Sequence, residues 1–298
     1  MTTIAILSRR HLRLFWRDRL TVFFSLLGPL ALFVLFTIFL RKQTANLIQK
    51  GVPGSSDADA YGMCDAWVFA SVVALASFTA SLGMLNGFVD DRVTSRFSDY
   101  LVAPVNRAEL AISYVISTVV VSFVISTIFT GCGQIWALCF GQQMMSWRQW
   151  GLALAAILLA CVIFSAMNTF IVTFLTSQGA MGGYSVTMGV ATGFLAYCFV
   201  APSTLSTTIN NVLGVLPFAQ TASLIRDPLM KPAANQIISV LPTVDVQNQA
   251  RDAVLNSLGV TLTVDGTVLS NWLVVGILAG LSVIFGVLVS FRMGRVIH

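Results

Sequence analysis

The chain has 298 residues, of which 56% are hydrophobic and only 10% are charged, and its formal net charge is +5. Soluble domains carry roughly a quarter charged residues, so this composition excludes an ordinary soluble fold. Uncharged runs long enough to cross a hydrocarbon core of about 30 Å recur along the whole chain. The sequence therefore predicts one all-α integral membrane domain over residues 1–298, with about six spans.

The positive charge and the cysteines indicate neither nucleic-acid binding nor metal binding. The basic residues lie at predicted helix ends and in loops, not on a continuous surface that also carries aromatic side chains. We therefore predict no nucleic-acid partner. Four of the five cysteines lie in apolar runs and no CxxC pair occurs, so we expect neither a disulfide framework nor a metal site.

Residues 1–20 are predicted to form a basic amphipathic helix on the membrane surface. Arg9, Arg13 and Arg17 recur at helical spacing, and apolar residues such as Leu7 fall on the opposite side. Anionic headgroups attract such a basic face, so membrane lipid is a predicted partner of this helix.

The first three spans are predicted from apolar runs that polar segments separate. They cover residues 22–40, 67–89 and 110–133. Residues 41–64 are polar and rich in turn-forming residues, so we expect a loop of moderate length there. Residues 90–109 hold seven charged residues and form a predicted cytoplasmic loop between the second and third spans.

Residues 150–225 contain no Asp, Glu, Lys or Arg, and two further spans are predicted within this stretch. They cover residues 152–175 and 184–200, and a glycine-rich turn over residues 177–183 is expected to join them. The last span is predicted over residues 273–291.

Residues 201–271 are predicted to form an outer segment. Part of it is too apolar for an ordinary loop, but prolines interrupt it before span length is reached, which favours a re-entrant helical hairpin over a seventh span. The candidate hairpin and gate residues are Pro217, Phe218, Arg226 and Asp227. Arg226 and Asp227 either form an outer gate pair or mark the solvent-exposed end of the hairpin.

The distribution of lysine and arginine predicts the orientation in the membrane. With the N-terminus in the cytoplasm, ten arginines lie in short cytoplasmic segments, and the other seven basic residues lie in much longer outer segments. We therefore predict a multi-pass protein of the cell membrane, the plasma membrane, with both termini in the cytoplasm.

Several functional classes lack the residues that they need. The predicted spans contain no Asp, Glu, Lys or Arg, which disfavours proton relays and ion-coupled transport. The sequence has no GxxxxGK[ST] phosphate loop and no TVGYG-like filter, so an ATPase would have to be a separate polypeptide. Its two histidines lie at the ends of the chain, and we expect no catalytic, cofactor or metal site. A pore without an ATPase and a Na⁺-driven carrier with uncharged sites stay open as alternatives.

Polar uncharged side chains within the predicted spans are candidates for lining a transport pathway. They are Asn86, Asn168, Thr169 and Thr173. Hydrogen bonding between helices is the favoured alternative role for such side chains.

The order of these parts resembles the membrane subunit of an ABC transporter of the ABC-2 type, the exporter permease family. The resemblance covers nearly the whole chain and rests on the N-terminal helix, on the segment from Asp91 to Leu110, and on the proline-bearing hairpin over residues 216–228. Four residues match the family pattern that leads into the third span: Leu101, Pro104, Val105 and Arg107.

The resemblance implies a non-catalytic transmembrane subunit of an ATP-driven exporter, with a second permease copy or a related subunit as partner. ATP and Mg²⁺ would bind to separate ATP-binding subunits, and this chain would bind no cofactor. The resemblance also implies that the N-terminal helix and the loop after the second span dock on the ATPase. The docking residues predicted in this way are Asp90, Asp91, Arg92, Arg96, Asp99, Arg107, Glu109, Arg9 and Arg13. The expected substrate is a hydrophobic or amphipathic drug, peptide or lipid.

Overall fold

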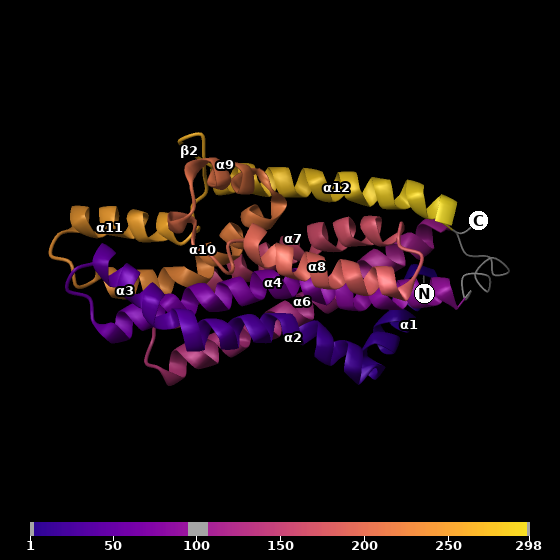
Figure 1. Cartoon of the computed structure of the whole chain (residues 1–298), viewed down its shortest axis with the longest axis horizontal. Helices are drawn as coiled ribbons and strands as arrows, with labels where there is room; N and C mark the ends of the chain where they lie inside the picture. Colours follow the sequence, from indigo (N-terminus) through magenta and orange to yellow (C-terminus); the bar gives the residue numbers. More distant parts are fainter. Residues whose placement is uncertain (1–2, 95–106, 297–298) are drawn as a thin grey trace.

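The computed structural model describes residues 3–94 and 107–296 as a bundle of long helices that lie side by side (Figure 1). The described secondary structure is almost entirely helical, which confirms the expected all-α class. The exception is a short antiparallel hairpin of β1 (Thr263–Val264) and β2 (Thr267–Val268).

The N-terminal half begins with a surface helix and contains the longest helix of the described chain. Its elements are α1 (Thr3–Arg17), α2 (Arg19–Leu35), the π-helical turn η1 (Phe36–Leu40), α3 (Arg41–Gly51) and α4 (Asp57–Val93). Asp18 separates α1 from α2 and caps α2, because its carboxylate accepts a hydrogen bond from the backbone N–H of Thr21 at 3.1 Å. A helix thus lies where the sequence predicts the N-terminal one, a single residue separates it from α2, and its position on the membrane surface stays a prediction.

The C-terminal half packs around α4. Its elements are α6 (Arg107–Cys139), α7 (Trp147–Val172), α8 (Gln178–Leu195), the 3₁₀ turn η2 (Pro202–Thr204), α9 (Thr207–Val215), α10 (Pro217–Ile238), α11 (Val244–Ser257) and α12 (Asn271–Val296).

Among the described residues, five helical segments are long and apolar enough to cross a membrane. They are Arg19–Gly51, Asp57–Val93, Ala108–Cys139, Trp147–Val172 and Asn271–Arg292. Each of these candidate spans contains most or all of one span that the sequence predicts.

The predicted span over residues 184–200 is not among these five segments. Its helix, α8, begins at Gln178 and ends at Leu195. The predicted glycine-rich turn over residues 177–183 is wrong, because Ser177 caps α8 through a hydrogen bond from the backbone N–H of Ala180 and the glycines continue the helix.

The loop predicted over residues 41–64 is also largely wrong. α2, η1 and α3 run on without a break, and α4 already begins at Asp57, where Ser56 caps it. The guanidinium of Arg41 donates hydrogen bonds of 2.8 and 2.6 Å to the two carboxylate oxygens of Asp65. This pair holds α3 against α4, so the polar residues form helices that extend the bundle instead of a loop.

α4 forms the centre of the bundle. Of its most apolar stretch, 94% is buried, compared with 22% for the segment Arg19–Gly51 and 17% for Asn271–Arg292. Small residues on α4 allow close packing: a Cβ atom on Gly83 would lie 2.7 Å from the Cβ atom of Ser25 in α2. The outward faces of α2 and α12 are therefore left for lipid or for another protein chain.

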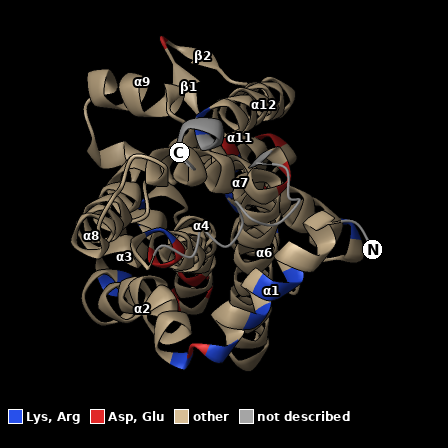
Figure 2. Cartoon of the chain, turned by 90° about the vertical axis from the view of Figure 1, so that its right-hand side faces the viewer, with Lys and Arg blue, Asp and Glu red and all other residues tan. Residues whose placement is uncertain are grey.

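The bundle has two different ends (Figure 1). The terminal end holds α1, the C-terminal ends of α4 and α12, and the start of α8. The distal end holds α3, α11 and the start of α4. Figure 2 views the terminal end and shows the basic residues along α1.

The segment before the last span folds into helices that pack into the bundle. α9 and α10 meet at Leu216, and α10 continues for 22 residues with Pro228 and Pro232 inside it. Its first turn lies deep in the bundle, since the ring centre of Phe218 is 5.7 Å from that of Phe78 in α4 and 5.6 Å from that of Phe164 in α7. The sequence pattern predicts that prolines interrupt this segment, but α10 continues through Pro228 and Pro232.

Candidate functional site

Three consecutive charged residues at the end of α4 contact different neighbouring helices. We call Asp90, Asp91 and Arg92 the charge cluster. Successive residues of a helix point about 100° apart, so the three side chains leave α4 in different directions. Asp90 Oδ1 accepts a hydrogen bond of 3.1 Å from Nε2 of Gln178 at the start of α8.

Asp91 joins α4 to α1 and to α6. Its side chain is only 4% exposed, and its Oδ2 accepts hydrogen bonds from the hydroxyl of Tyr114 at 2.8 Å and from Nη1 of Arg10 at 3.3 Å. A buried carboxylate is stable when such partners compensate its lost hydration. Asp91 thus fixes the surface helix α1 to the centre of the bundle.

Arg92 joins α4 to the end of α7. Its Nη1 donates hydrogen bonds of 2.9 Å to the carbonyl oxygens of Thr173 and Leu175, directly after Val172, the last residue of α7. A cation is favourable at a helix C-terminus, where backbone carbonyls lack partners. The charge cluster therefore connects α1, α6, α7 and α8 to α4.

Three more contacts attach α1 to α6. The Ser8 hydroxyl donates to the carbonyl of Ser113, and the Ser117 hydroxyl donates to the carbonyl of Ser8, both at 3.3 Å. The His11 ring stacks on Tyr114 with a centroid distance of 3.9 Å. Burial, together with the nearby charge of Arg10, lowers the pKa of His11 to about 4, so the histidine is neutral at pH 7.

The structure locates part of the predicted docking set. Asp90, Asp91 and Arg92 come together in the charge cluster, where each already has a partner within the chain. Glu109 lies in the first turn of α6, and Arg9 and Arg13 are exposed on α1. Arg96, Asp99 and the side chain of Arg107 lie outside the described residues. Docking of an ATPase on these residues stays a prediction.

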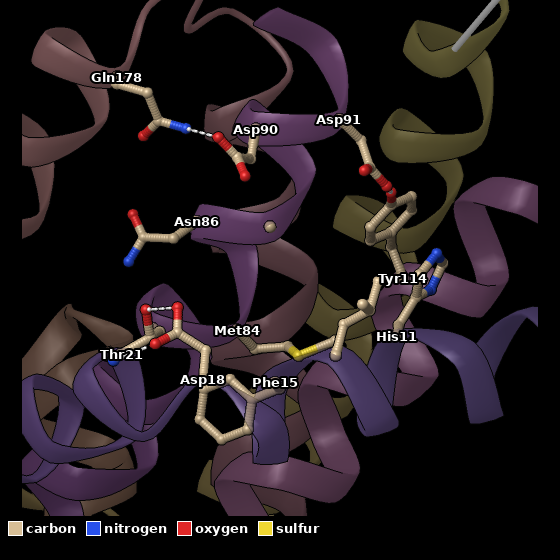
Figure 3. A pocket seen from close by; sticks show the side chains of 13 residues that line it. His11, Phe15, Asp18, Thr21, Met84, Asn86, Asp90, Asp91, Tyr114 and Gln178 are labelled. Atoms are coloured by element: carbon tan, nitrogen blue, oxygen red, sulfur yellow. Dashed lines mark hydrogen bonds between the residues drawn. The ribbon is translucent and has the colours of Figure 1, made fainter. Parts of the chain in front are cut away.

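A cavity of about 440 Å³ opens beside the charge cluster, between α1, the start of α2, α4, α6 and α8 (Figure 3). Leu14, Phe15 and Met84 supply apolar wall, and Asp18 and Asp90 supply carboxylates. Its lining thus combines apolar and acidic groups in one space at the terminal end.

The predicted pathway residues have different surroundings. Asn86 lines this cavity. Asn168 is buried, where it donates to the Ser81 hydroxyl at 2.6 Å and accepts from the Tyr184 hydroxyl at 2.8 Å. Buried Thr169 and Thr173 donate to carbonyls of their own helix region. Asn168 thus bridges helices, which is the alternative role that the sequence favoured.

Arg226 occupies a second polar site, nearer the distal end. Arg226 is fully buried, so it does not mark a solvent-exposed end of the hairpin. Asp227 pairs with Lys231 one turn later at 2.7 Å. Arg226 Nη2 donates to the carbonyls of Ala196 and Tyr197 at 2.9 and 2.8 Å. Arg226 and Asp227 thus have different partners in this structure, and a gating role for them stays a prediction.

Two helix ends stabilise the buried Arg226 cation. The carbonyls of Ala196 and Tyr197 follow the last residue of α8, and Gly259, whose carbonyl accepts from Arg226 Nη1 at 3.4 Å, follows α11. Both helix dipoles thus direct their negative ends toward the guanidinium. The Ser71 hydroxyl accepts a further bond at 3.0 Å, and the Trp67 ring lies 5.7 Å away. These groups replace a carboxylate partner.

Sequence reasoning missed Arg10, Tyr114 and Gln178 as partners of the charge cluster.

The spacing of hydroxyl residues in the sequence nevertheless indicates the buried face of α6. Hydroxyl residues repeat every four or five positions along this predicted span, at Ser113, Ser117, Ser122, Ser126 and Thr130. All five are buried, and such spacing is typical of a helix face that packs against other helices.

Comparison with known proteins identifies the family. The sequence model of the family described as ABC-2 family transporter protein matches residues 41–291. No curated protein matches the sequence. In the described residues, no group of three or more His, Cys, Asp or Glu is placed to hold a metal ion. Since the match covers most of the chain and all five apolar segments wholly or in part, this protein belongs to the ABC-2 family of transporter membrane proteins.

Proposed function

We propose that the chain is the permease subunit of an ATP-driven exporter, in which two copies form the pathway and separate subunits hydrolyse ATP. ABC-2 permeases generally pair with ATP-binding subunits, and the Mg²⁺-ATP would bind to these partners. The substrate is a hydrophobic or amphipathic compound. The protein lies in the plasma membrane with the terminal end in the cytoplasm.

The charge cluster is the observation that carries this proposal. A partner that holds α1 and moves would pull on α4 and α6 through Arg10, Asp91 and Tyr114. The same motion would reach α7 through Arg92, whose guanidinium holds the carbonyls of Thr173 and Leu175. A movement at the membrane surface is thereby passed to several spans as a rigid-body change.

The path of the chain supports a six-span topology with α8 as the fifth span. α8 starts beside Asp90 at the terminal end and ends beside Arg226. Its 18 residues are about 27 Å long, close to the thickness of a hydrocarbon core. With α8 included, the chain crosses six times and returns α12 to the end that holds α1.

Arginine and tryptophan positions support the orientation. Arg9, Arg13 and Arg17 are exposed on α1 at the terminal end, as the positive-inside rule requires of a cytoplasmic surface. Trp147 and Trp272 lie at the starts of α7 and α12, away from the terminal end, and are 92% and 86% exposed. Exposed tryptophans are typical of a membrane interface, so these two mark the outer boundary.

The position of α10 supports an outer re-entrant hairpin made of α9 and α10. Phe218, at the start of α10, lies among Phe78 and Phe164 in the middle of two spans. From there α10 runs outward and ends at Ile238. A helix that starts inside the membrane is tolerated when protein surrounds it, and α10 is largely buried.

Co-purification with an ATPase tests this proposal. The tagged protein, solubilised from its native membrane, should retain a stoichiometric subunit with a phosphate loop and should hydrolyse ATP. The double variant R96E/R107E should lose the ATPase but insert normally, and the control R148E/R251E changes the charge equally elsewhere. A chain that purifies alone and transports without ATP would refute the proposal and favour a pore or a Na⁺-driven carrier.

A further inference from the structure

The cavity beside the charge cluster has an acidic lining. Among the described residues, its wall contains three aspartates and no lysine or arginine. Asp91 is already paired with Arg10, but Asp18 and Asp90 each accept hydrogen bonds only from uncharged groups, Thr21 and Gln178. Figure 3 shows Asp18 and Asp90 on different sides of the cavity, with Asn86 between them.

Both of these aspartates face solvent and form no ion pair with a described residue. The hydroxyl and the backbone N–H of Thr21 donate to the Asp18 carboxylate, and these bonds hold the pKa of Asp18 below its ordinary value. Asp18 is therefore ionised at neutral pH. None of the described residues that line the cavity carries a positive charge to compensate these two carboxylates.

The rest of the wall is apolar or open. Phe15 and Met84 are buried side chains that line the cavity, and Leu14 is half exposed at its edge. A Cβ atom added to Gly87 would meet no atom within 4 Å, so this wall residue leaves space free. A volume of about 440 Å³ is within the usual range for small-molecule sites.

His11 adds a buried polar group to the lining of the cavity. It is 3% exposed and lines the cavity, and neither ring nitrogen has a hydrogen-bond partner among the described residues. Buried polar groups without partners are rare. The neutral ring of His11 thus leaves hydrogen-bonding capacity at the wall of the cavity.

We propose that this cavity binds an amphipathic organic cation, with its positive charge near Asp18 and Asp90 and its apolar body against Phe15 and Met84. The inference rests on the proposed function and specifies its substrate class. The site lies where the surface helix α1 meets α4, so a compound held in the headgroup layer can reach it directly. The choline group of a lipid has the same chemistry, and the experiment distinguishes it from a free cation.

Binding of tetraphenylphosphonium to the full-length chain in non-ionic detergent tests this proposal. Tetraphenylborate has the same shape with the opposite charge and is the matched ligand. We expect the cation to bind and the anion not to bind. D18N and D90N should each weaken cation binding about fivefold, and the double variant about 25-fold, because each removes one partly exposed charge pair.

Two controls separate charge from folding. Asn retains the capping ability of Asp18, and D252N removes an exposed carboxylate from α11 without touching the cavity. G87F should block binding by filling the free space, whereas G87A should bind normally. If phosphatidylcholine displaces the cation, a lipid headgroup is the natural ligand of the site. If it does not displace the cation, the natural ligand is a free cation.

Equal binding of both ligands, or full binding by the double variant, would overturn the cation site. Because the assay uses the chain alone and no ATP, its failure is distinct from failure of the proposed function. A chain that retains its ATPase but does not bind the cation is a permease with another substrate. If the chain binds the cation but has no partner ATPase, the cation site is supported and the proposed ATP-driven function is refuted.

Discussion

Replacement of Arg226 by methionine should destabilise the packing of α10 against α4 and the end of α8. Methionine approaches arginine in length but cannot donate hydrogen bonds. The variant leaves the carbonyls of Ala196, Tyr197 and Gly259 and the hydroxyl of Ser71 without the bonds that Arg226 supplies. In a fully buried site no water replaces them.

The magnitude follows from the four hydrogen bonds. Each carbonyl or hydroxyl left unsatisfied costs about 1 kcal/mol or more, which gives about 4 kcal/mol for the set. Removal of the guanidinium also removes the cost of burying its charge, which offsets part of this loss. We therefore expect a net loss of about 2–3 kcal/mol in unfolding free energy.

Thermal unfolding in detergent and limited proteolysis of residues 239–243 would measure this effect. R226K retains the charge and some donors, so its melting temperature should lie between those of R226M and the wild type. D227N changes the neighbouring residue, whose partner is Lys231, and should melt close to the wild type. If R226M melts like the wild type, or if D227N loses more stability than R226M, the structural role derived for Arg226 is wrong.

Two predictions concern the attachment of α1. The pKa of His11 falls from 6.5 to about 4 on folding, so the folded state binds fewer protons than the unfolded state below pH 6.5. The free energy of unfolding should therefore be full above pH 6.5 and decrease by about 3 kcal/mol as the pH falls to 4. H11F, which retains the stacking on Tyr114, should lack this dependence in melts between pH 4 and 7. D91N retains an oxygen for Tyr114 but loses the charge that holds Arg10, so transport per ATP hydrolysed should fall about fivefold. Unchanged transport by D91N, or loss of the co-purified ATPase, would contradict a coupling role.

The five long apolar helices were predictable from the sequence because the membrane imposes a local rule on composition. Charged residues are costly in the hydrocarbon core, so uncharged runs such as residues 67–89 mark spans without knowledge of the fold. The rule does not say where a helix ends outside the membrane. Residues 41–51 are polar, yet Arg41 bonds to Asp65, 24 positions later, and the segment continues as α3.

The candidate site was predictable in its location but not in its contacts. Seven charged residues between two apolar runs predicted a functional segment over residues 90–109, which includes Asp90, Asp91 and Arg92. Their partners come from distant positions: Arg10 lies 81 residues from Asp91, and Gln178 lies 88 residues from Asp90. The prolines near Arg226 predicted a re-entrant hairpin with Arg226 as a gate residue or at its solvent-exposed end. The hydrogen bond to Ser71, 155 residues away in the sequence, shows that this arginine lies in the interior. Such contacts follow from the packing of helices, which hydropathy does not specify.

α4 and α8 connect the two polar sites of the bundle. α4 carries the charge cluster at one end and, about 30 Å away along its axis, Ser71 beside Arg226. α8 begins at Gln178, bound to Asp90, and its C-terminal carbonyls bind Arg226. A displacement of the α4 end would act on Arg226 through these two helices, and Arg226 contacts the carbonyl of Gly259 after α11. We therefore expect a change at α1 to alter the packing of α10 and the Gly259 turn, and we expect R226M to weaken that response even where the charge cluster is intact.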